Sequence, residues 1–104
     1  MIYTTTQEIP GRRIVEVLGV VTGNVVQTKH LGKDVAAKFK SLIGGEIVGY
    51  TEMLTEARHR AIARMVQAAL ELDADAVVGL RFTTSSIMSN ASEILAYGTA
   101  VKLE

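Results

Sequence analysis

The spacing of apolar residues along the chain predicts a strand, a short helix, a long helix and then two further strands. β-Branched residues dominate positions 14–26, which is typical of a strand. The pattern does not alternate cleanly, because both faces carry apolar residues: Ile14, Glu16, Leu18, Val20 and Thr22 on one, and Val15, Val17, Val21 and Val25 on the other. A strand with one solvated face alternates, so we expect this strand to be covered on both sides.

Helical spacing follows in two segments. Residues 33–43 carry apolar residues at helical intervals, and Gly44-Gly45 would end this short helix, because glycine readily adopts the left-handed conformation of a helix end. A long helix is predicted from about Gly49 to Leu72. Its apolar positions follow one another in steps of four and three residues: Tyr50, Leu54, Ala57, Ala61, Met65, Ala68 and Leu72.

The long helix carries a second apolar line, formed by Ile62, Val66 and Leu70. At about 100° per residue this line is turned well away from the first. A small monomer offers a helix only one core, so the second line meets either the short helix or another subunit. We take these three residues as candidates for an oligomer interface.

Two strands are predicted after the long helix, at residues 76–84 and 94–103. Three large residues of the first would share one face: Val78, Leu80 and Phe82. Arg81 would project from the opposite face. The residues between the strands, 85–93, are rich in serine and predict a polar turn.

The predicted fold class is α+β, a two-layer β-α-β-β subunit with one long helix on an antiparallel or mixed sheet. The length of 104 residues fits one domain with its own core, residues 1–104. The doubly apolar first strand and the second helix line would both be accounted for by assembly into a homo-oligomer, although the second line could instead meet the short helix.

Composition removes several classes of function. Eleven basic and eleven acidic residues balance, which argues against a nucleic-acid partner. There is no cysteine, so disulfides, thiolate metal sites and cysteine nucleophiles are excluded. The chain opens without the basic start and apolar stretch of a secretory signal, and no apolar run reaches the ~20 residues that span a bilayer. We therefore expect a cytoplasmic protein with no membrane partner.

Several local motifs resemble the YbjQ-like family, in the right order and over nearly the whole chain. They are Gly19-Val20-Val21-Thr22-Gly23, Gly44-Gly45, Tyr50 with Glu52, Ala57-Arg58, Ala74-Asp75-Ala76-Val77-Val78-Gly79 and Gly98-Thr99-Ala100-Val101. The resemblance implies a small protein without an established biochemical activity, from a family often labelled heavy-metal-binding. It also implies a dodecin-subunit-like fold and assembly into a homopentamer.

One position departs from the family pattern. The family usually has glycine immediately before the Ala-Asp-Ala-Val-Val-Gly motif, where the long helix ends, and this chain has Asp73. A left-handed helix end costs aspartate more than glycine, although aspartate tolerates it better than most residues. The substitution therefore bears on the local turn and not on the fold.

The family label makes a metal site the first chemistry to weigh. Glu52, Glu56 and His59 follow one another at i, i+4 and i+7, so a helix would align them along one side. Repeated around an oligomer axis, such groups could bind a cation. Zinc sites normally assemble three or four close ligands, so the competing interpretation is a solvated face on which Glu56 pairs with Arg60. His30 has no ligand-type neighbour within a turn.

A ligand site is the second candidate. Arg81 projects from an apolar strand, and with Thr83 and Thr22 it could line a pocket for an anion or another small ligand. The competing interpretation is an Arg81–Glu16 ion pair at a subunit contact, because arginine is enriched at protein interfaces. No cofactor is predicted by any motif.

Catalysis is the remaining alternative. No Gly-x-Ser-x-Gly motif surrounds Ser85, Ser86 or Ser89, and neither the full P-loop nor the Gly-x-Gly-x-x-Gly pattern occurs. An enzyme would have to form its site at a subunit boundary, from Thr22 and Arg81 together with Glu52 and His59. The sequence thus predicts first a homo-oligomeric structural or binding module that holds a small ligand or ion between subunits, and second a metal-binding protein or such an enzyme.

Overall fold

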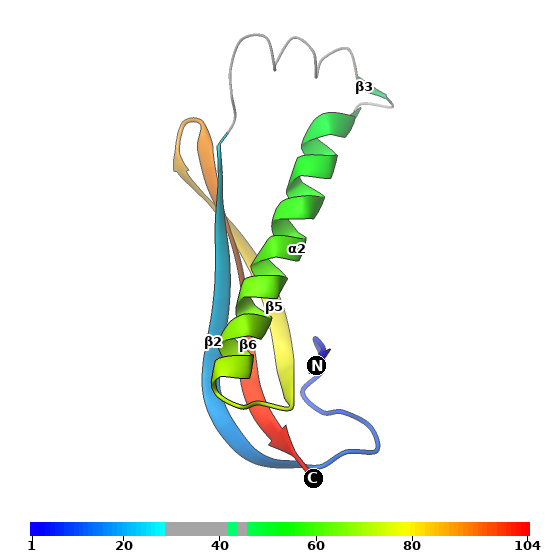
Figure 1. Cartoon of the computed structure of the whole chain (residues 1–104). Coiled ribbons are helices and arrows are strands. Elements are labelled where there is room, and N and C mark those ends of the chain that lie inside the picture. Colours follow the sequence, from blue (N-terminus) through cyan, green and yellow to red (C-terminus); the bar gives the residue numbers. More distant parts are fainter. Residues whose placement is uncertain (29–41, 44–45) are drawn as a thin grey trace.

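The computed structural model describes residues 1–28, 42–43 and 46–104. One long helix lies against one face of a twisted sheet, and the molecule is elongated, with extents of 53 × 27 × 17 Å (Figure 1). The elements in chain order are β1 (Ile2–Tyr3), β2 (Ile14–Thr28), β3 (Leu42–Ile43), β4 (Glu46–Ile47), α2 (Val48–Glu71), β5 (Ala76–Met88) and β6 (Ala91–Leu103). The α+β class and the long helix on a sheet are as the sequence predicts.

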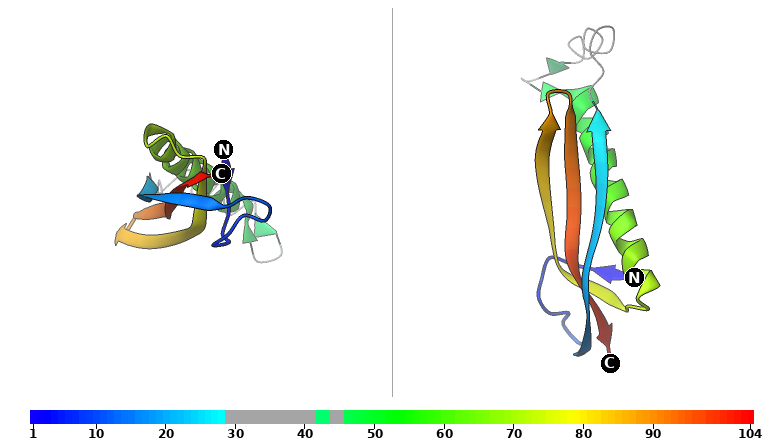
Figure 2. Two further views of the ribbon diagram at one scale, coloured as in Figure 1. Left: turned by 90° about the horizontal axis from the view of Figure 1, so that it is seen from below. Right: turned by 90° about the vertical axis from the view of Figure 1, so that its left-hand side faces the viewer.

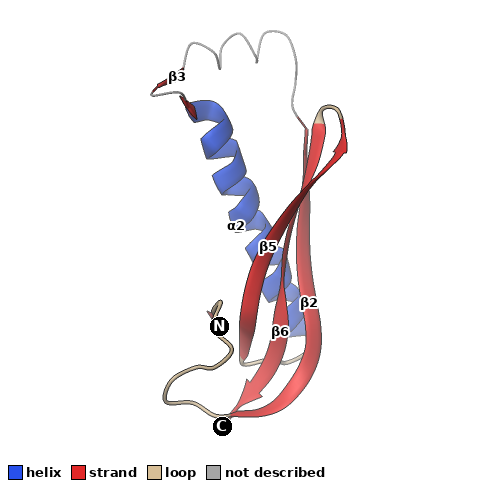
Figure 3. Ribbon diagram, turned by 180° about the vertical axis from the view of Figure 1, so that it is seen from behind, coloured by secondary structure: helices blue, strands red, loops and turns tan. Residues whose placement is uncertain are grey.

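The main sheet is mixed and has the strand order β1-β5-β6-β2. β6 pairs antiparallel with both β2 and β5, whereas the short β1 pairs parallel with β5. The helix α2 crosses behind β2 and β6, as the side view of Figure 2 shows. The view from behind in Figure 3 shows the three long strands and the N-terminal segment at their lower end. The short strand β1 adds to the predicted β-α-β-β order.

Two boundaries differ from the sequence prediction. The predicted helix at 33–43 lies outside the described residues except for Leu42–Ile43, which is a strand paired with Glu46–Ile47 and not a helix end. The predicted turn at 85–93 is much shorter, because β5 continues to Met88 and β6 begins at Ala91. Ser85, Ser86 and Ser92 belong to the paired strands, with one register shift between Ser86 and Met88, so their turn preference yields to pairing between the strands.

A bulge at Gly19 explains why β2 does not alternate. The register with β6 shifts between Val17 and Gly19, and Gly19 has a φ of 137°. Leu18 and Val21 therefore both pack on the helix side, whereas Val20 points away from the helix. The predicted division of β2 into two faces was wrong, because this extra residue and a further register shift between Ile14 and Glu16 each reverse the alternation.

A second bulge, at Gly79 in β5, has the same effect. Gly79 has a φ of 65°, and the register with β6 shifts between Val78 and Arg81. Val77 and Leu80 belong to the core beneath the helix, while Val78 lies in a second cluster on the opposite face. The prediction that Val78 shares a face with Leu80 and Phe82 was therefore wrong, but Arg81 does lie opposite Leu80.

The core forms where small helix residues meet the sheet. Ala57, Ala61, Met65 and Ala69 are all 0% exposed. A Cβ built on Gly23 of β2 would collide with the Ala61 carbonyl oxygen and the Met65 amide nitrogen, and would lie 2.9 Å from the Arg64 carbonyl carbon. The helix backbone thus rests directly on the backbone of β2. At its lower end the buried line runs through Ala69, whereas Leu72, beyond the last helical residue, is 44% exposed.

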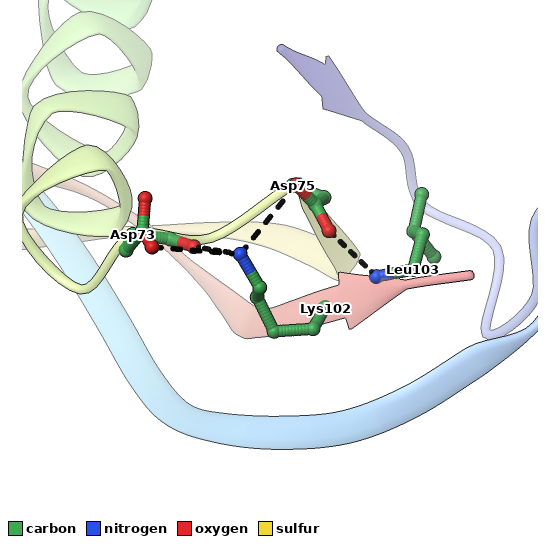
Figure 4. Close-up of polar contacts among 4 residues, drawn as sticks. All are labelled: Asp73, Asp75, Lys102 and Leu103. Carbon is green, nitrogen blue, oxygen red and sulfur yellow. Dashed lines mark hydrogen bonds and ion pairs between the residues drawn. The ribbon is translucent and has the colours of Figure 1, made fainter.

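The helix ends in a left-handed residue at Asp73, the position at which the aspartate had left the local turn in question. Asp73 has a φ of 61°; its amide donates to the Leu70 carbonyl, and the Ala74 amide donates to the Ala69 carbonyl. These two hydrogen bonds are the Schellman pattern. Lys102 of β6 donates to the Asp73 carbonyl over 2.9 Å and lies 3.6 Å from its carboxylate (Figure 4).

Asp75 completes this polar cluster. Its Oδ2 accepts a hydrogen bond of 2.8 Å from the Leu103 amide, and its Oδ1 lies 3.8 Å from the Lys102 ammonium (Figure 4). The lysine and the two aspartates thereby tie the helix end to the end of β6. Because the Asp73 side chain is 99% exposed, its ion pair contributes little, and the backbone contacts fix the turn.

The contact at Gly23 yields a stability prediction. Gly23→Ala should lower the free energy of unfolding by about 3 kcal/mol, because the added methyl group meets helix backbone that cannot give way without separating the two layers. Chemical denaturation would measure the loss. The neighbouring Thr22→Ala, at an exposed position, should cost less than about 1 kcal/mol. Equal losses for the two variants would contradict the close helix–strand contact.

The left-handed turn at Asp73 yields a second stability prediction, this time of an increase. Asp73→Gly should raise the free energy of unfolding by about 1 kcal/mol, since glycine adopts a φ of 61° without steric cost. The midpoint of thermal unfolding should rise by roughly 4–8 °C, at matched protein concentration. Asp73→Ala, which keeps the strain and removes the carboxylate, is the control. A Gly variant no more stable than the Ala variant would show that the backbone strain is negligible.

Candidate functional site

The predicted ligand residues Thr22, Arg81 and Thr83 lie on one face of the sheet, the face without the helix. Thr22 of β2 is in register with Tyr97 of β6, and Tyr97 is in register with Arg81 of β5. These three residues form one row across the sheet. With strands about 4.8 Å apart, the backbones of Thr22 and Arg81 are separated by roughly 10 Å.

The next row continues the same face. Asn24, Leu95 and Thr83 are in register across the three strands. The Asn24 side-chain amide donates to a Glu93 carboxylate oxygen over 3.1 Å. We call the two rows together the polar rows. They combine one guanidinium, two threonine hydroxyls, an amide and a phenol, all of which can donate hydrogen bonds.

Apolar side chains surround the polar rows along β2. Val20 is 74% exposed, Val17 67% and Val26 51%. The expected cover on both sides of this strand is thus not supplied within the described chain, because α2 covers one face only. Exposed valines on a sheet face next to hydrogen-bonding groups are typical of an interaction surface.

The Arg81 side chain is held in place from two directions. Its NH1 group donates to the Thr5 carbonyl over 2.9 Å and to the Leu80 carbonyl over 2.8 Å. Among the described residues it forms no ion pair, and Glu16 is in register with Lys102, at the far end of the sheet from the polar rows. The alternative Arg81–Glu16 pair is therefore absent within the chain, and as a contact between subunits it stays a prediction.

The N-terminal segment covers the lower part of this face. Ile9 packs with Ala76, Val78 and Val101. The Thr4 amide donates to the Val77 carbonyl, and the carbonyls of Thr4 and Thr6 accept from the amides of Leu80 and Gly79. A cavity of about 730 Å³ is lined by residues 7–14 alone. It therefore contains none of the residues predicted to bind a ligand, and those residues lie on an open face rather than in an enclosed pocket.

The predicted metal ligands lie on the other side of the molecule. Glu52, Glu56 and His59 are all exposed on the outer surface of α2. In the described part of the chain no three histidine, aspartate or glutamate side chains gather closely enough to hold a metal ion. With no cysteine available either, these residues do not form the donor set of a heavy-metal site. His30 lies outside the described residues.

The predicted interface line on α2 divides in two. Ile62 and Val66 are half-buried and pack against the chain's own core, whereas Leu70 is 53% exposed. Only the lower end of the line is therefore free in a single chain. Its role in an oligomer stays a prediction.

The four residues considered for an enzyme do not meet in one chain. Thr22 and Arg81 lie on the face without the helix, and Glu52 and His59 project from the outer side of the helix. The sheet and the helix layer separate the two pairs. Any site that combined them would need residues from different subunits.

The whole chain, residues 1–104, matches the family described as "Putative heavy-metal-binding". The chain belongs to this YbjQ family. It is 67% identical over 104 residues to a UPF0145 protein of Thermotoga petrophila, covering 100% of this chain and 98% of that protein. It is 69% identical over 103 residues to a UPF0145 protein of Vibrio campbellii, with 99% of each covered.

A solved structure shows the same fold. A protein of unknown function from Pediococcus pentosaceus, assigned to the DUF74 family, superimposes with a TM-score of 0.69 over 100% of this chain and 98% of that one, at 18% identity. At 18% identity this similarity shows a shared fold and nothing about function. Among the described residues no helix combines the length and apolar character needed to cross a bilayer.

Sequence reasoning missed Tyr97 and Asn24, which join the predicted residues into rows. Tyr97 is 36% exposed and lies between Thr22 and Arg81. The signal was present in the last strand, where large residues alternate with small ones and the large ones face away from the helix. What the sequence could not give is the register, which places Tyr97 in the row of Thr22 and Arg81.

The two hydrogen bonds of Arg81 predict how the N-terminal segment responds to its loss. In Arg81→Ala, the amides of Thr4, Gly79 and Leu80 should exchange with deuterium roughly tenfold faster, since a bond from a charged donor contributes about 1.5 kcal/mol or more. Amides of Ala96 and Val101 should keep their protection. Thr83→Ala is the control, and unchanged exchange in Arg81→Ala would show that the segment is held without this side chain.

Proposed function

We propose that this YbjQ-family protein is a homo-oligomeric binding module, which holds a small anionic ligand on the polar rows at a boundary between subunits. The observation that carries the proposal is the register of Thr22, Tyr97 and Arg81, which aligns their side chains across the face without the helix. The proposal places the module in the cytoplasm, and the family resemblance gives five as the expected number of subunits.

Self-association is supported by the unequal cover of the sheet. α2 buries one face, while Val17, Val20 and Val26 stay largely exposed on the other. Burial of apolar surface contributes about 25 cal/mol per Å². Association with a second copy that covers these valines would therefore be favoured over separate monomers. Leu70 and Leu72, 53% and 44% exposed at the end of the helix, add to the uncovered apolar surface.

The anionic character of the ligand follows from the charges on the face. Arg81 is the one cation among the polar rows, and its guanidinium uses NH1 for the two carbonyl bonds described above. Thr22 and Thr83 add hydroxyl donors beside it. A carboxylate or phosphate matches this set, because a guanidinium and hydroxyls donate to both.

The state of assembly is tested directly by native mass spectrometry on protein purified without a metal-affinity tag. We expect a multiple of the 11.2 kDa chain mass, and in Val20→Asp a shift to single chains, because burying the added carboxylate costs several kcal/mol. Gln67→Asp, an exposed change on the outer side of the helix, should leave the assembly intact. A wild-type protein that remains a single chain at micromolar concentration would overturn the proposal.

Ligand binding is tested by thermal unfolding with inorganic phosphate and a panel of small carboxylates. A ligand at a hundred times its Kd should stabilise the protein by about 2.7 kcal/mol. Arg81→Ala should abolish this gain and Thr83→Ala should reduce it, while Arg13→Ala, which removes an exposed arginine bonded to Glu104, should retain it. A gain that survives in Arg81→Ala would place binding elsewhere.

Metal binding is the competing function, and only the family's description favours it. Glu52, Glu56 and His59 would need matching groups from a second subunit. The same native mass spectrum tests this idea, because bound Zn²⁺ would add its mass to the intact oligomer. An added metal mass that disappears in His59→Ala, with phosphate and carboxylates inactive in the unfolding assay, would favour the metal over the anion.

A further inference from the structure

The sheet has two open edges that run in the same direction. β2 pairs only with β6, so its outer edge is free over Ile14–Thr28 among the described residues. β5 is paired on its outer side by β1 and the N-terminal segment as far as Leu80, and in the described chain nothing pairs with it beyond that point. Because β2 and β5 are both antiparallel to β6, the two free edges are parallel to each other.

Apart from the register shifts of β2, one of them at Gly19, and the shift between Ser86 and Met88 in β5, neither edge carries the residues that normally block pairing. Exposed edge strands are usually protected by proline, lysine or inward charges. Residues 14–28 contain no proline or lysine and one charged residue, Glu16, and residues 81–88 contain one charged residue, Arg81. Arg64 of the helix donates to the Asn24 carbonyl, which protects a single position of β2. Long unprotected edges of this kind are stable in solution when another strand pairs with them.

The helix is displaced towards β2, which would leave room for a strand and helix of a neighbouring copy beside β5. In the side view of Figure 2, α2 lies behind β2 and extends beyond its outer edge, while the upper part of β5 has no helix behind it. Phe82 of β5, in register with the buried Ala96 on the helix side, is accordingly 40% exposed. A neighbouring copy that added its β2 to this β5 would bring its overhanging helix over Phe82.

We infer that subunits associate by adding the β2 edge of one copy to the free β5 edge, residues 81–88, of the next, so that the sheet continues from copy to copy. The inference rests on the proposed self-association and specifies its geometry. An edge-to-different-edge contact is heterologous, and it closes into a ring when the rotation between copies divides the circle. The polar rows then continue across each joint, and Thr22 of one copy lies beside Arg81 of the next rather than two strands away from it.

The absence of native cysteine allows a direct test by disulfide formation. Val20→Cys or Val26→Cys on β2 is combined with Thr83→Cys or Ser85→Cys on β5, giving four double variants. All four side chains are exposed, and those on the two strands lie on the same face. Within one chain the paired positions are about 10 Å or more apart across β6, too far for a disulfide, whose Cα atoms lie within about 7 Å.

After mild oxidation, we expect at least one double variant to run as a ladder of covalent multimers on a denaturing gel without reductant, with most of the chain leaving the monomer band. The four single-cysteine variants are the controls and should remain monomeric on the same gel. Thermal unfolding under reducing conditions verifies that each variant is folded.

Two results would overturn the inference while leaving self-association intact. A single β2 cysteine that converts the chain into covalent dimers would show that two β2 edges meet in a symmetric contact. An oligomeric native mass with no ladder from any of the four pairs would show that the subunits meet through other surfaces. A monomeric native mass would overturn both this inference and the proposed function.

Discussion

The direct contact between the α2 backbone and Gly23 is the constraint on which the rest of the structure depends. Gly23 leaves no side chain between strand and helix, and alanines at positions 57, 61 and 69 let the helix approach along most of its length. So close a contact centres the helix on β2 and β6 rather than on the middle of the whole sheet. The uncovered face of β5, the exposed Phe82 and the overhang beyond β2 all follow from this placement.

The same placement separates the two kinds of candidate chemistry. The outer side of the helix carries the exposed carboxylates and His59, and the opposite side of the sheet carries Arg81 and the threonines. The described residues of one YbjQ chain therefore offer a surface of hydrogen-bond donors around Arg81 on one side and a helix surface with Glu52, Glu56 and His59 on the other, with the core between them. A function that uses both can arise only where copies of the chain meet, and this makes assembly the first property to establish.

Much of the fold could be predicted from the sequence, because the signals were periodic. The helix was expected from about Gly49 to Leu72 and runs over Val48–Glu71. The turn after it was left in question by an aspartate where the resembled family usually has glycine, and Asp73 does adopt the left-handed conformation. The bulges were not predictable in this way, since glycine in a strand indicates either a bulge or a close contact. Gly19 and Gly79 form bulges, whereas Gly23 makes a contact, and only the register distinguishes them. Thr22, Arg81 and Thr83 were proposed from the sequence as the lining of one ligand pocket, and this role stays a prediction. They share one open face of the sheet, and their alignment with Tyr97 required the pairing of β6.

The bulges at Gly19 and Gly79 lie at nearly the same height in the sheet, on either side of a β6 strand that continues without interruption. Below them, the face without the helix is closed by the N-terminal segment, and above them it is open. Each bulge reverses which face of the sheet the following side chains occupy. The loss of one residue from either strand at its bulge would therefore exchange the helix-facing and outward-facing side chains of that strand above the bulge. A chain one residue shorter at Gly79 would therefore turn Arg81 and Thr83 towards the helix, and one shorter at Gly19 would do the same to Thr22 and Asn24.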